Sequence, residues 1–316
     1  MHLPHNGAGG RRRACEAGSV GSHVLHRPVL DWYATHARDL PWRSADRSPW
    51  GVLVSEVMLQ QTPVARVLPA WHEWLRRWPD ASSLAAEPAG EAVRAWGRLG
   101  YPRRALRLHA AATVIRDEHG GRVPSTYDAL LALPGIGDYT AAAVASFAFG
   151  ARHAVLDTNV RRVLARAVSG RADPAPSITA AERRLAESLV PDGDDAAVWA
   201  VAVMELGALV CTARAARCES CPVAQGCAWR LAGSPTSETT GRRTQPWHGT
   251  DRQVRGRLLA VARAATPGEP VTLGDLVAAT PDDGLRDPRQ RERCLASLVE
   301  DGLLEQCGEN RYCLPG

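Results

Sequence analysis

The stretch of sequence that decides the fold is Leu133-Pro134-Gly135-Ile136-Gly137-Asp138-Tyr139-Thr140. Its proline and glycines end one helix and start another, and both Gly135 and Gly137 can take the positive φ that a tight turn requires. Such a turn presents backbone N–H groups at a helix N-terminus. These groups bind one DNA phosphate, often with a monovalent cation held by the turn carbonyls. A purely structural connection between two helices is the alternative interpretation of the turn taken alone.

A second segment makes the interpretation more specific. About 20 residues further on, the chain runs Val155-Leu156-Asp157-Thr158-Asn159-Val160-Arg161-Arg162. Asp157 precedes a helical run that begins at Thr158 or Asn159, which is the usual place of an N-cap. A helix N-terminus also keeps a carboxylate ionised, which suits a group that faces a cationic transition state. The capping role and a catalytic role are therefore compatible.

Glu56 is the one acid in an otherwise apolar stretch over residues 52–59. Apolar neighbours desolvate a carboxyl group and raise its pKa, which keeps a proton available for general acid catalysis. An exposed glutamate on an amphipathic helix is the alternative. Cleavage of an N-glycosidic bond needs one protonated and one ionised carboxyl group, because the sugar becomes an oxocarbenium ion while the leaving group is protonated. Glu56 and Asp157 fit these two roles if the fold brings them together.

Four cysteines form a compact cluster at the end of a predicted helix. Cys211, Cys218, Cys221 and Cys227 have the spacing C-x6-C-x2-C-x5-C. Structural zinc sites normally use two CxxC knuckles, and only one is present, whereas a [4Fe–4S] cluster takes four thiolates from one loop. The spacing favours an iron–sulfur cluster, with zinc as the alternative. Arg214 and Arg217 lie inside the loop and can contact a phosphate backbone.

Composition excludes several classes of protein. No apolar run reaches the roughly 18 residues of a membrane span, and the first segment has no hydrophobic signal core, so we expect a cytoplasmic protein. Eight cysteines in such a chain favour metal or cluster ligation over disulfides. The formal net charge is +4 and every one of the 38 basic residues is arginine. Arginine supplies phosphate contacts, but no lysine is available to form a Schiff base.

Hydrophobic periodicity predicts a mostly α chain in four parts. We expect a disordered basic extension at 1–24, a helical unit at 25–232 that contains the cysteine loop 211–227, and a linker at 233–250. Helices followed by a terminal hairpin predict a small, winged-helix-like α/β module at 251–316, with a packing domain that makes no nucleic-acid contact as the alternative. The clearest helices are expected over residues 49–61, 64–78, 103–119, 194–209, 254–265, 273–279 and 288–301.

Together, the Gly-Ile-Gly turn, the Leu-Asp-x-Asn-Val segment and the cysteine spacing resemble the endonuclease III superfamily, over about residues 29–229. Leu40-Pro41-Trp42-Arg43 and Ser55-Glu56-Val57-Met58-Leu59-Gln60-Gln61-Thr62 are similar to the MutY-type adenine DNA glycosylases. The resemblance implies a two-lobed helix-hairpin-helix glycosylase with a [4Fe–4S] loop. It further implies a monomer that acts at the bacterial nucleoid and removes adenine opposite 8-oxoguanine or guanine in double-stranded DNA.

The same resemblance implies roles for individual residues. Glu56 protonates the adenine, at N7, and then activates water, while Asp157 stabilises the sugar cation and Asn159 orients the catalytic groups. Tyr139 stands where bifunctional relatives have the lysine nucleophile, which implies a monofunctional hydrolase. The other implied contacts are those of Trp42 and Arg43 with the flipped adenine, of Gln60 and Gln61 with the space it leaves, and of Thr62, Gly135, Gly137, Arg214 and Arg217 with DNA.

Two features depart from the family pattern. Val201 stands where relatives often have a Glu or Gln that holds the adenine. The larger MutT-like domain and its Phe-Ser-His loop, which read 8-oxoguanine, are not evident, and the tail looks like the shortened form of some actinobacterial relatives. Two alternatives to an adenine glycosylase stay open. One is an endonuclease III-like pyrimidine glycosylase and lyase, and the other is a non-enzymatic iron–sulfur protein that binds DNA or senses redox state.

Overall fold

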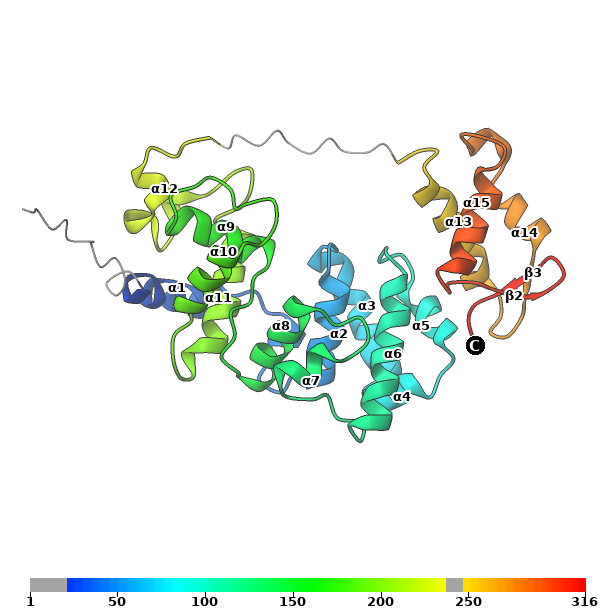
Figure 1. Cartoon of the computed structure of the whole chain (residues 1–316), viewed down its shortest axis with the longest axis horizontal. Coiled ribbons are helices and arrows are strands. Elements are labelled where there is room, and N and C mark those ends of the chain that lie inside the picture. The colour runs from blue at the N-terminus through cyan, green and yellow to red at the C-terminus, as the bar shows by residue number, and fades with distance from the viewer. Residues whose placement is uncertain (1–21, 237–246) are drawn as a thin grey trace, which may run out of the picture.

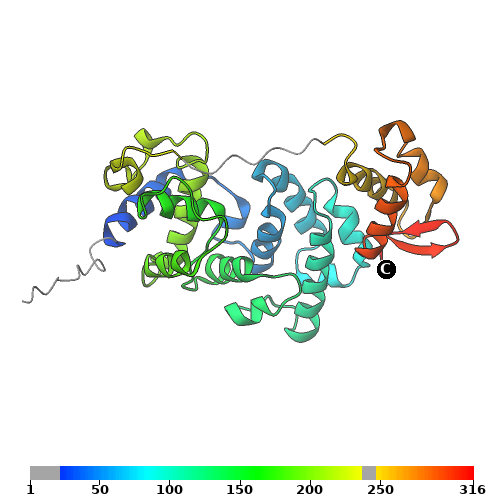
Figure 2. The same ribbon diagram turned by 45° about the horizontal axis from the view of Figure 1, so that its top comes forward.

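The structure is a computed structural model that describes residues 22–236 and 247–316. These residues form two helical lobes and a smaller C-terminal module that lies at the far side of the central lobe (Figures 1 and 2). The described chain starts in the first lobe with residue 22, builds the central lobe and then returns to the first. The prediction of a mostly α fold is confirmed, since among the described residues strands occur only in the module.

The central lobe is organised around buried tryptophans. Trp74 packs edge-to-face on Trp78 and Trp96, with ring centroids 4.7 and 5.6 Å away. All three side chains are fully buried. The lobe consists of α2 (Pro49–Leu59), α3 (Val64–Arg77), α4 (Ala81–Ala85), α5 (Ala89–Trp96), α6 (Arg103–Glu118), α7 (Tyr127–Leu131) and α8 (Asp138–Phe149).

The first lobe joins the start of the described chain to the segment that carries the cysteines. Its core combines Val29 and Trp32 with apolar residues of α9 and α11, such as Leu164 and Leu206. The lobe consists of α1 (Ser22–His36), α9 (Thr158–Ala167), α10 (Ala180–Ser188), α11 (Asp195–Leu209), α12 (Ala228–Leu231) and two short 3-10 turns, η2 (Cys218–Ser220) and η3 (Ala224–Gly226). A further 3-10 turn, η1 (Pro41–Arg43), lies between α1 and α2.

The C-terminal module has the element order of a winged helix: helix, strand, two helices, two strands. Its three strands form an antiparallel sheet in the order β1-β3-β2. Sequence patterning predicted the helices and the hairpin but missed β1, which is too short to show an alternation. The elements are α13 (Asp251–Ala264), β1 (Val271–Thr272), α14 (Leu273–Ala278), η4 (Asp282–Gly284), α15 (Gln290–Glu300), β2 (Glu305–Gly308) and β3 (Arg311–Cys313).

Most expected helices are present, and two of their boundaries are wrong for physical reasons. The helix expected over 49–61 ends at Leu59, because Gln60 leaves helical geometry with ψ 109° and Gln61 has a φ of 55°. The helix expected from residue 254 begins at Asp251, since the Thr250 hydroxyl caps it by accepting from the backbone N–H of Gln253. The other expected helices agree with the structure to within two residues at each end.

The predicted extension and linker are only partly tested. Helix α1 begins at Ser22, two residues before the expected end of the extension. The rest of that extension and residues 237–246 of the linker lie outside the described residues. No helix in the described parts of the chain is long and apolar enough to cross a membrane.

Candidate active site

A cavity of about 450 Å³ is lined by residues from both lobes. It contains two carboxyl groups that are about 100 positions apart in the sequence, Glu56 on α2 and Asp157 at the start of α9. Several other predicted site residues line the same cavity, so the fold gathers all four predicted catalytic residues and three of the predicted substrate or DNA contacts. These residues are Trp42, Arg43, Thr62, Tyr139 and Asn159.

Glu56 is held in an apolar helix and is only 5% exposed, so the interpretation as an exposed surface glutamate is wrong. The Tyr139 hydroxyl donates a hydrogen bond to Oε2 of Glu56 at 2.8 Å. Burial and the charge of Glu56 raise the pKa of Tyr139 well above its usual range, so the phenol stays protonated. Burial raises the pKa of Glu56 to about 7, against the opposing effects of the Tyr139 hydrogen bond and the Arg43 charge. Glu56 can therefore hold a proton near neutral pH, as predicted.

Asp157 is the N-cap of α9, as predicted. Its Oδ1 accepts from the backbone N–H of Val160 at 2.6 Å, and its Oδ2 accepts from Nδ2 of Asn159 at 2.7 Å. Burial raises the pKa of Asp157, while the hydrogen bonds from Val160 and Asn159 oppose that rise and favour the ionised form that the sequence analysis expects. The Asp157 charge in turn raises the pKa of Glu56.

Asn159 is oriented by a residue that sequence reasoning missed. Nη2 of Arg162 donates to Oδ1 of Asn159 at 2.8 Å and to the carbonyl of Gly207 at 2.7 Å. This contact leaves the amide nitrogen of Asn159 facing Asp157. A Cβ at Gly207 would lie 2.7 Å from Cβ of Asn159, so only glycine lets α11 approach α9 this closely. A glycine inside a long apolar helix was the available sequence signal.

Arg43 is fixed by a buried acid that sequence reasoning also missed. Nη2 of Arg43 donates to Oε2 of Glu205 at 3.0 Å, and Arg38 donates to both carboxylate oxygens at 2.7 Å. Burial disfavours the charge of Glu205, but the two arginines outweigh this effect and lower its pKa to about 2. Nη1 of Arg43 is buried without a hydrogen-bond partner in the described structure. Val201 lies on the cavity wall and adds an apolar surface there.

The Gly-Ile-Gly turn lies outside this cavity, at the start of α8. Gly135 has a φ of 74°, and a Cβ there would lie 2.5 Å from Cβ of Arg107. Gly137 instead is the N-cap of α8 with a φ of −102°, so the expectation of positive φ is wrong for this residue. Gly137 and Asp138 are exposed, and among the described residues no side chain caps the first N–H groups of α8.

Two loops that each contain a residue with positive φ are joined by Arg104, and one of them borders the cavity. Gln61, between the cavity-lining residues Leu59 and Thr62, is exposed with a φ of 55°. Tyr101, on the loop before α6, is 49% exposed with a φ of 48°. Gln60 instead turns inward, where its amide donates to Oγ1 of Thr140 at 3.3 Å.

Buried Arg104 connects these loops, a role that sequence reasoning did not assign. Its Nη1 donates to the carbonyl of Gln60 at 2.6 Å, and its Nη2 donates to the carbonyl of Gly100 at 3.0 Å. Nη2 also lies 3.0 Å from Oγ1 of Thr62. The sequence Gly100-Tyr101-Pro102 was a visible turn signal, but nothing local indicated its partner.

The four cysteines of the cluster line one small cavity at the end of α11. All four are free thiols, and the charged side chains around the cavity are arginines, Arg166, Arg217 and Arg230. Across residues 22–236 and 247–316, no three His, Cys, Asp or Glu side chains are gathered closely enough to hold a metal ion. Four thiols in a basic surrounding nevertheless match the donors that an anionic iron–sulfur cluster needs. Arg214 and Arg217 are exposed in this loop, and neither lines the larger cavity.

The sequence matches the family described as HhH-GPD superfamily base excision DNA repair protein over residues 54–188. An adenine DNA glycosylase of Mycobacterium tuberculosis is 51% identical over 93% of this chain and 94% of its own length. One of Mycolicibacterium smegmatis is 52% identical over 91% and 95%. The human adenine DNA glycosylase is 38% identical over 73% of this chain, which spans 48% of that protein.

Solved structures agree with the fold. A thermostable thymine-DNA glycosylase aligns with a TM-score of 0.60 and 30% identity, over 67% of this chain and 97% of its own. A trapped endonuclease III–DNA covalent intermediate aligns with a TM-score of 0.57 and 20% identity over the same shares. The unmatched part of this chain is as large as the C-terminal module together with the termini and linker.

Proposed function

Because the chain belongs to the adenine DNA glycosylases of the HhH-GPD superfamily, we propose that it removes adenine mispaired with 8-oxoguanine or guanine in double-stranded DNA. The base is extruded into the 450 Å³ cavity, and the N-glycosidic bond is hydrolysed there. The observation that carries this proposal is the buried pair of carboxyl groups, one of which keeps a proton near neutral pH.

The cavity residues divide the reaction between them. Glu56 donates its proton to the adenine, at N7, as the bond from the sugar carbon C1′ breaks, and neutral adenine leaves. Asp157 stabilises the oxocarbenium sugar, and Asn159 keeps that carboxylate in place through its hydrogen bond. Ionised Glu56 then takes a proton from the water that attacks C1′. The products are free adenine and an abasic site, and Glu56 is again protonated.

Tyr139 makes the enzyme a hydrolase rather than a lyase. A lyase of this class needs an amine that attacks the sugar, and the chain contains no lysine. The group at this position is a phenol whose proton is engaged with Glu56 at 2.8 Å. Borohydride trapping on DNA should therefore give no covalent adduct, in contrast to the pyrimidine glycosylase and lyase alternative.

Adenine selection rests on the cavity wall. Trp42 supplies an aromatic surface and Arg43 an unused buried donor, Nη1, that can reach the ring nitrogens of the base. The side chain of Val201 offers no hydrogen bond, so the polar contacts with adenine come from other lining residues such as Arg43. Gln61 on the exposed loop probes the space that the adenine vacates, and Gln60 and Thr62 hold the base of that loop.

DNA is held outside the cavity by two further sites. The turn at Gly135 and Gly137 binds one phosphate, with a monovalent cation at its carbonyls. Cys211, Cys218, Cys221 and Cys227 hold a [4Fe–4S] cluster, which when bound supplies a rigid frame for the loop that carries Arg214 and Arg217. These arginines contact the phosphate backbone. We further propose that the protein acts as a monomer at the bacterial nucleoid.

The proposed activity is tested by strand cutting. Purified, cluster-loaded protein should release adenine from a duplex with one A:8-oxoguanine pair, and the strand should break only after hot alkali. A matched A:T duplex is the control for selectivity. Strand breakage without alkali would support the lyase alternative, and full retention of adenine would refute the proposed activity.

A further inference from the structure

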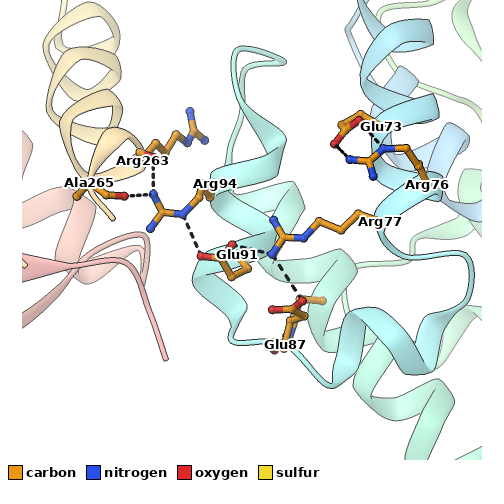
Figure 3. A network of polar contacts seen from close by, with 9 residues as sticks. Glu73, Arg76, Arg77, Glu87, Glu91, Arg94, Arg263 and Ala265 are labelled. Atoms are coloured by element: carbon orange, nitrogen blue, oxygen red, sulfur yellow. Dashed lines mark hydrogen bonds and ion pairs between the residues drawn. The ribbon is translucent and has the colours of Figure 1, made fainter. Parts of the chain in front are cut away.

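The C-terminal module is fixed to the central lobe rather than tethered to it. Apolar residues of the module, including Val254, Leu258 and Leu298, belong to the same buried core as the tryptophans of the lobe. A polar network at the edge of this core joins α5 to the end of α13 (Figure 3). Arg94 donates from Nη1 to the carbonyls of Ala265 and Arg263, and from Nε to Glu91 at 2.9 Å.

Further hydrogen bonds join the module and α5 at the same junction. Nε of Arg263 donates to the carbonyl of Val93 at 2.8 Å, and the backbone N–H of Gly90 donates to the carbonyl of Pro315 at 2.7 Å. A Cβ at Gly90 would lie 2.6 Å from that oxygen, so the chain end rests directly on α5. The module cannot turn away from α5 and α6 without breaking these contacts.

This docking brings α13 to the exposed Tyr101. The guanidinium of Arg252 lies 5.8 Å from the centroid of the Tyr101 ring. Asp301, at the end of α15, pairs with Arg103 of α6 at 3.1 Å and with Arg255 of α13 at 2.5 Å, which fixes the relative position of the three helices. Arg252 is exposed and has no ion pair or hydrogen bond in the described structure, so its charge is available.

Tyr101 is exposed on a loop that lies next to the loop of Gln61. Arg104 holds its loop against the loop of Gln61, next to the cavity that receives the base. A duplex that places a nucleotide in this cavity, as the proposed function requires, is expected to run past the exposed Gln61 and Tyr101. The first turn of α13 lies beside Tyr101, and its Arg252 is exposed there.

The face that winged helices usually present to DNA is unsuitable in this module. That face would be α15, whose exposed residues carry two acids and one arginine. They are Glu292, Arg293, Ala296, Val299 and Glu300. Arg293 is already paired with Asp287 at 3.1 Å. Because its exposed side chains carry more negative than positive charge, α15 would repel a phosphate backbone.

We propose that the C-terminal module extends the DNA-binding surface through the first turn of α13, with Arg252 as a phosphate contact beside Tyr101. The proposal rests on the proposed function only for the direction of the duplex. In this proposal the module helps to hold DNA, whereas the adenine is selected and its N-glycosidic bond is hydrolysed in the cavity between the lobes.

The test compares two arginines of α13 in full-length protein. Arg252→Gln removes the proposed contact. Arg257→Gln is the matched control, because Arg257 is equally exposed but its Nη1 lies 3.2 Å from the position of a Cβ on Gly284, away from Tyr101. Both are made in a Glu56→Gln background so that the duplex stays intact. Duplex affinity is then measured over a series of salt concentrations.

We expect Arg252→Gln to weaken binding and to reduce the slope of log affinity against log salt by about 1, the share of one phosphate contact, while Arg257→Gln changes neither. An unchanged slope for Arg252→Gln, or equal losses in both variants, would overturn the proposal. Adenine release by the Glu56-containing protein is assayed separately, so a failure of the proposed function is recognised independently of the binding result.

Discussion

At the scale of single residues, Glu56 and Asp157 are both buried carboxyl groups, but their hydrogen bonds favour the ionised form to different extents. Glu56 accepts one hydrogen bond, from a phenol, while Asp157 accepts two, from a backbone N–H and an amide. Hydrogen bonds to the ionised form favour that form, so Asp157 has the stronger compensation for burial. The proton of the pair therefore resides on Glu56, which is the division that the proposed reaction requires.

The raised pKa of Glu56 makes a prediction for stability. A carboxyl whose pKa rises from 4.5 to about 7 on folding stabilises the protein below 4.5, and this contribution is lost as pH rises through 7. Glutamine at this position does not ionise. Glu56→Gln should therefore gain stability relative to the parent between these pH values, by up to roughly 3 kcal/mol in the free energy of unfolding.

Thermal unfolding of both proteins across this pH range measures the effect. Glu73→Gln is the matched control, because Glu73 is fully exposed and its pKa is lowered by the hydrogen bond from Arg76. That control should show no gain at high pH. A Glu56→Gln variant whose unfolding temperature stays parallel to the parent at all pH values would mean that folding does not raise the pKa of Glu56.

At the scale of elements, α2 shows where sequence patterning stops being sufficient. Its apolar residues identified the helix and its buried acid, and the expected helix continued through the polar Gln60 and Gln61. The chain leaves the helix there because buried Arg104, 44 positions away from Gln60, takes the carbonyls of Val57, Met58 and Gln60 as acceptors. A long-range contact of this kind has no local signature, so neither the helix end nor the strained loop was predictable.

We expect Arg104 to affect extrusion of the base through the loops it joins, and not to affect the cleavage step itself. Arg104→Gln should release the Gln61 and Tyr101 loops and slow base extrusion roughly tenfold or more, which corresponds to about 1.4 kcal/mol. Fluorescence of 2-aminopurine at the target position reports extrusion directly. The pH dependence of cleavage should keep its midpoint, because Glu56 is untouched.

Arg116→Gln serves as the control for Arg104, since Arg116 lies on the same helix and is exposed. Thermal unfolding shows whether the Arg104 variant is folded, and Arg104→Lys tests whether charge alone restores the loops. Normal extrusion by a folded Arg104→Gln protein would rule out the positioning role.

The cysteine loop is the second element whose role is open to test. Cys218→Ser should abolish bound iron and the visible absorption of the cluster, because it removes one of four thiolates. Cys307→Ser, at an exposed position on β2, should retain both. Stoichiometric zinc in the parent protein would instead support the zinc alternative, and iron retained in Cys218→Ser would exclude this ligand set.

At the scale of the whole molecule, the module and the central lobe share one core. The predicted linker at 233–250 suggested a separable unit, since composition identifies flexible segments but not the surfaces that dock. The contacts of Arg94, Arg263 and Gly90 are again long-range and polar, which explains why the sequence did not reveal them. The motifs for the cavity and the turn, in contrast, are short and local and were recognised directly.

Truncation at about Pro235 should therefore destabilise the catalytic lobes. Removal of the module exposes the side of the core that Val254, Leu258 and Leu298 cover. We expect a lower unfolding temperature and a tendency to aggregate, measured by calorimetry and light scattering. A truncated protein as stable as the full chain would show that the module is an independent domain.

The account as a whole depends on Glu56 as the proton donor, and the pH dependence of single-turnover adenine release from an A:8-oxoguanine duplex tests it most directly. We predict a rate that falls as pH rises through about 7. In Tyr139→Phe this fall should move to higher pH, because the lost hydrogen bond had favoured ionised Glu56. Glu56→Gln should release almost no adenine at any pH. A Glu56→Gln protein that binds the duplex and releases adenine at the parental rate would contradict the account.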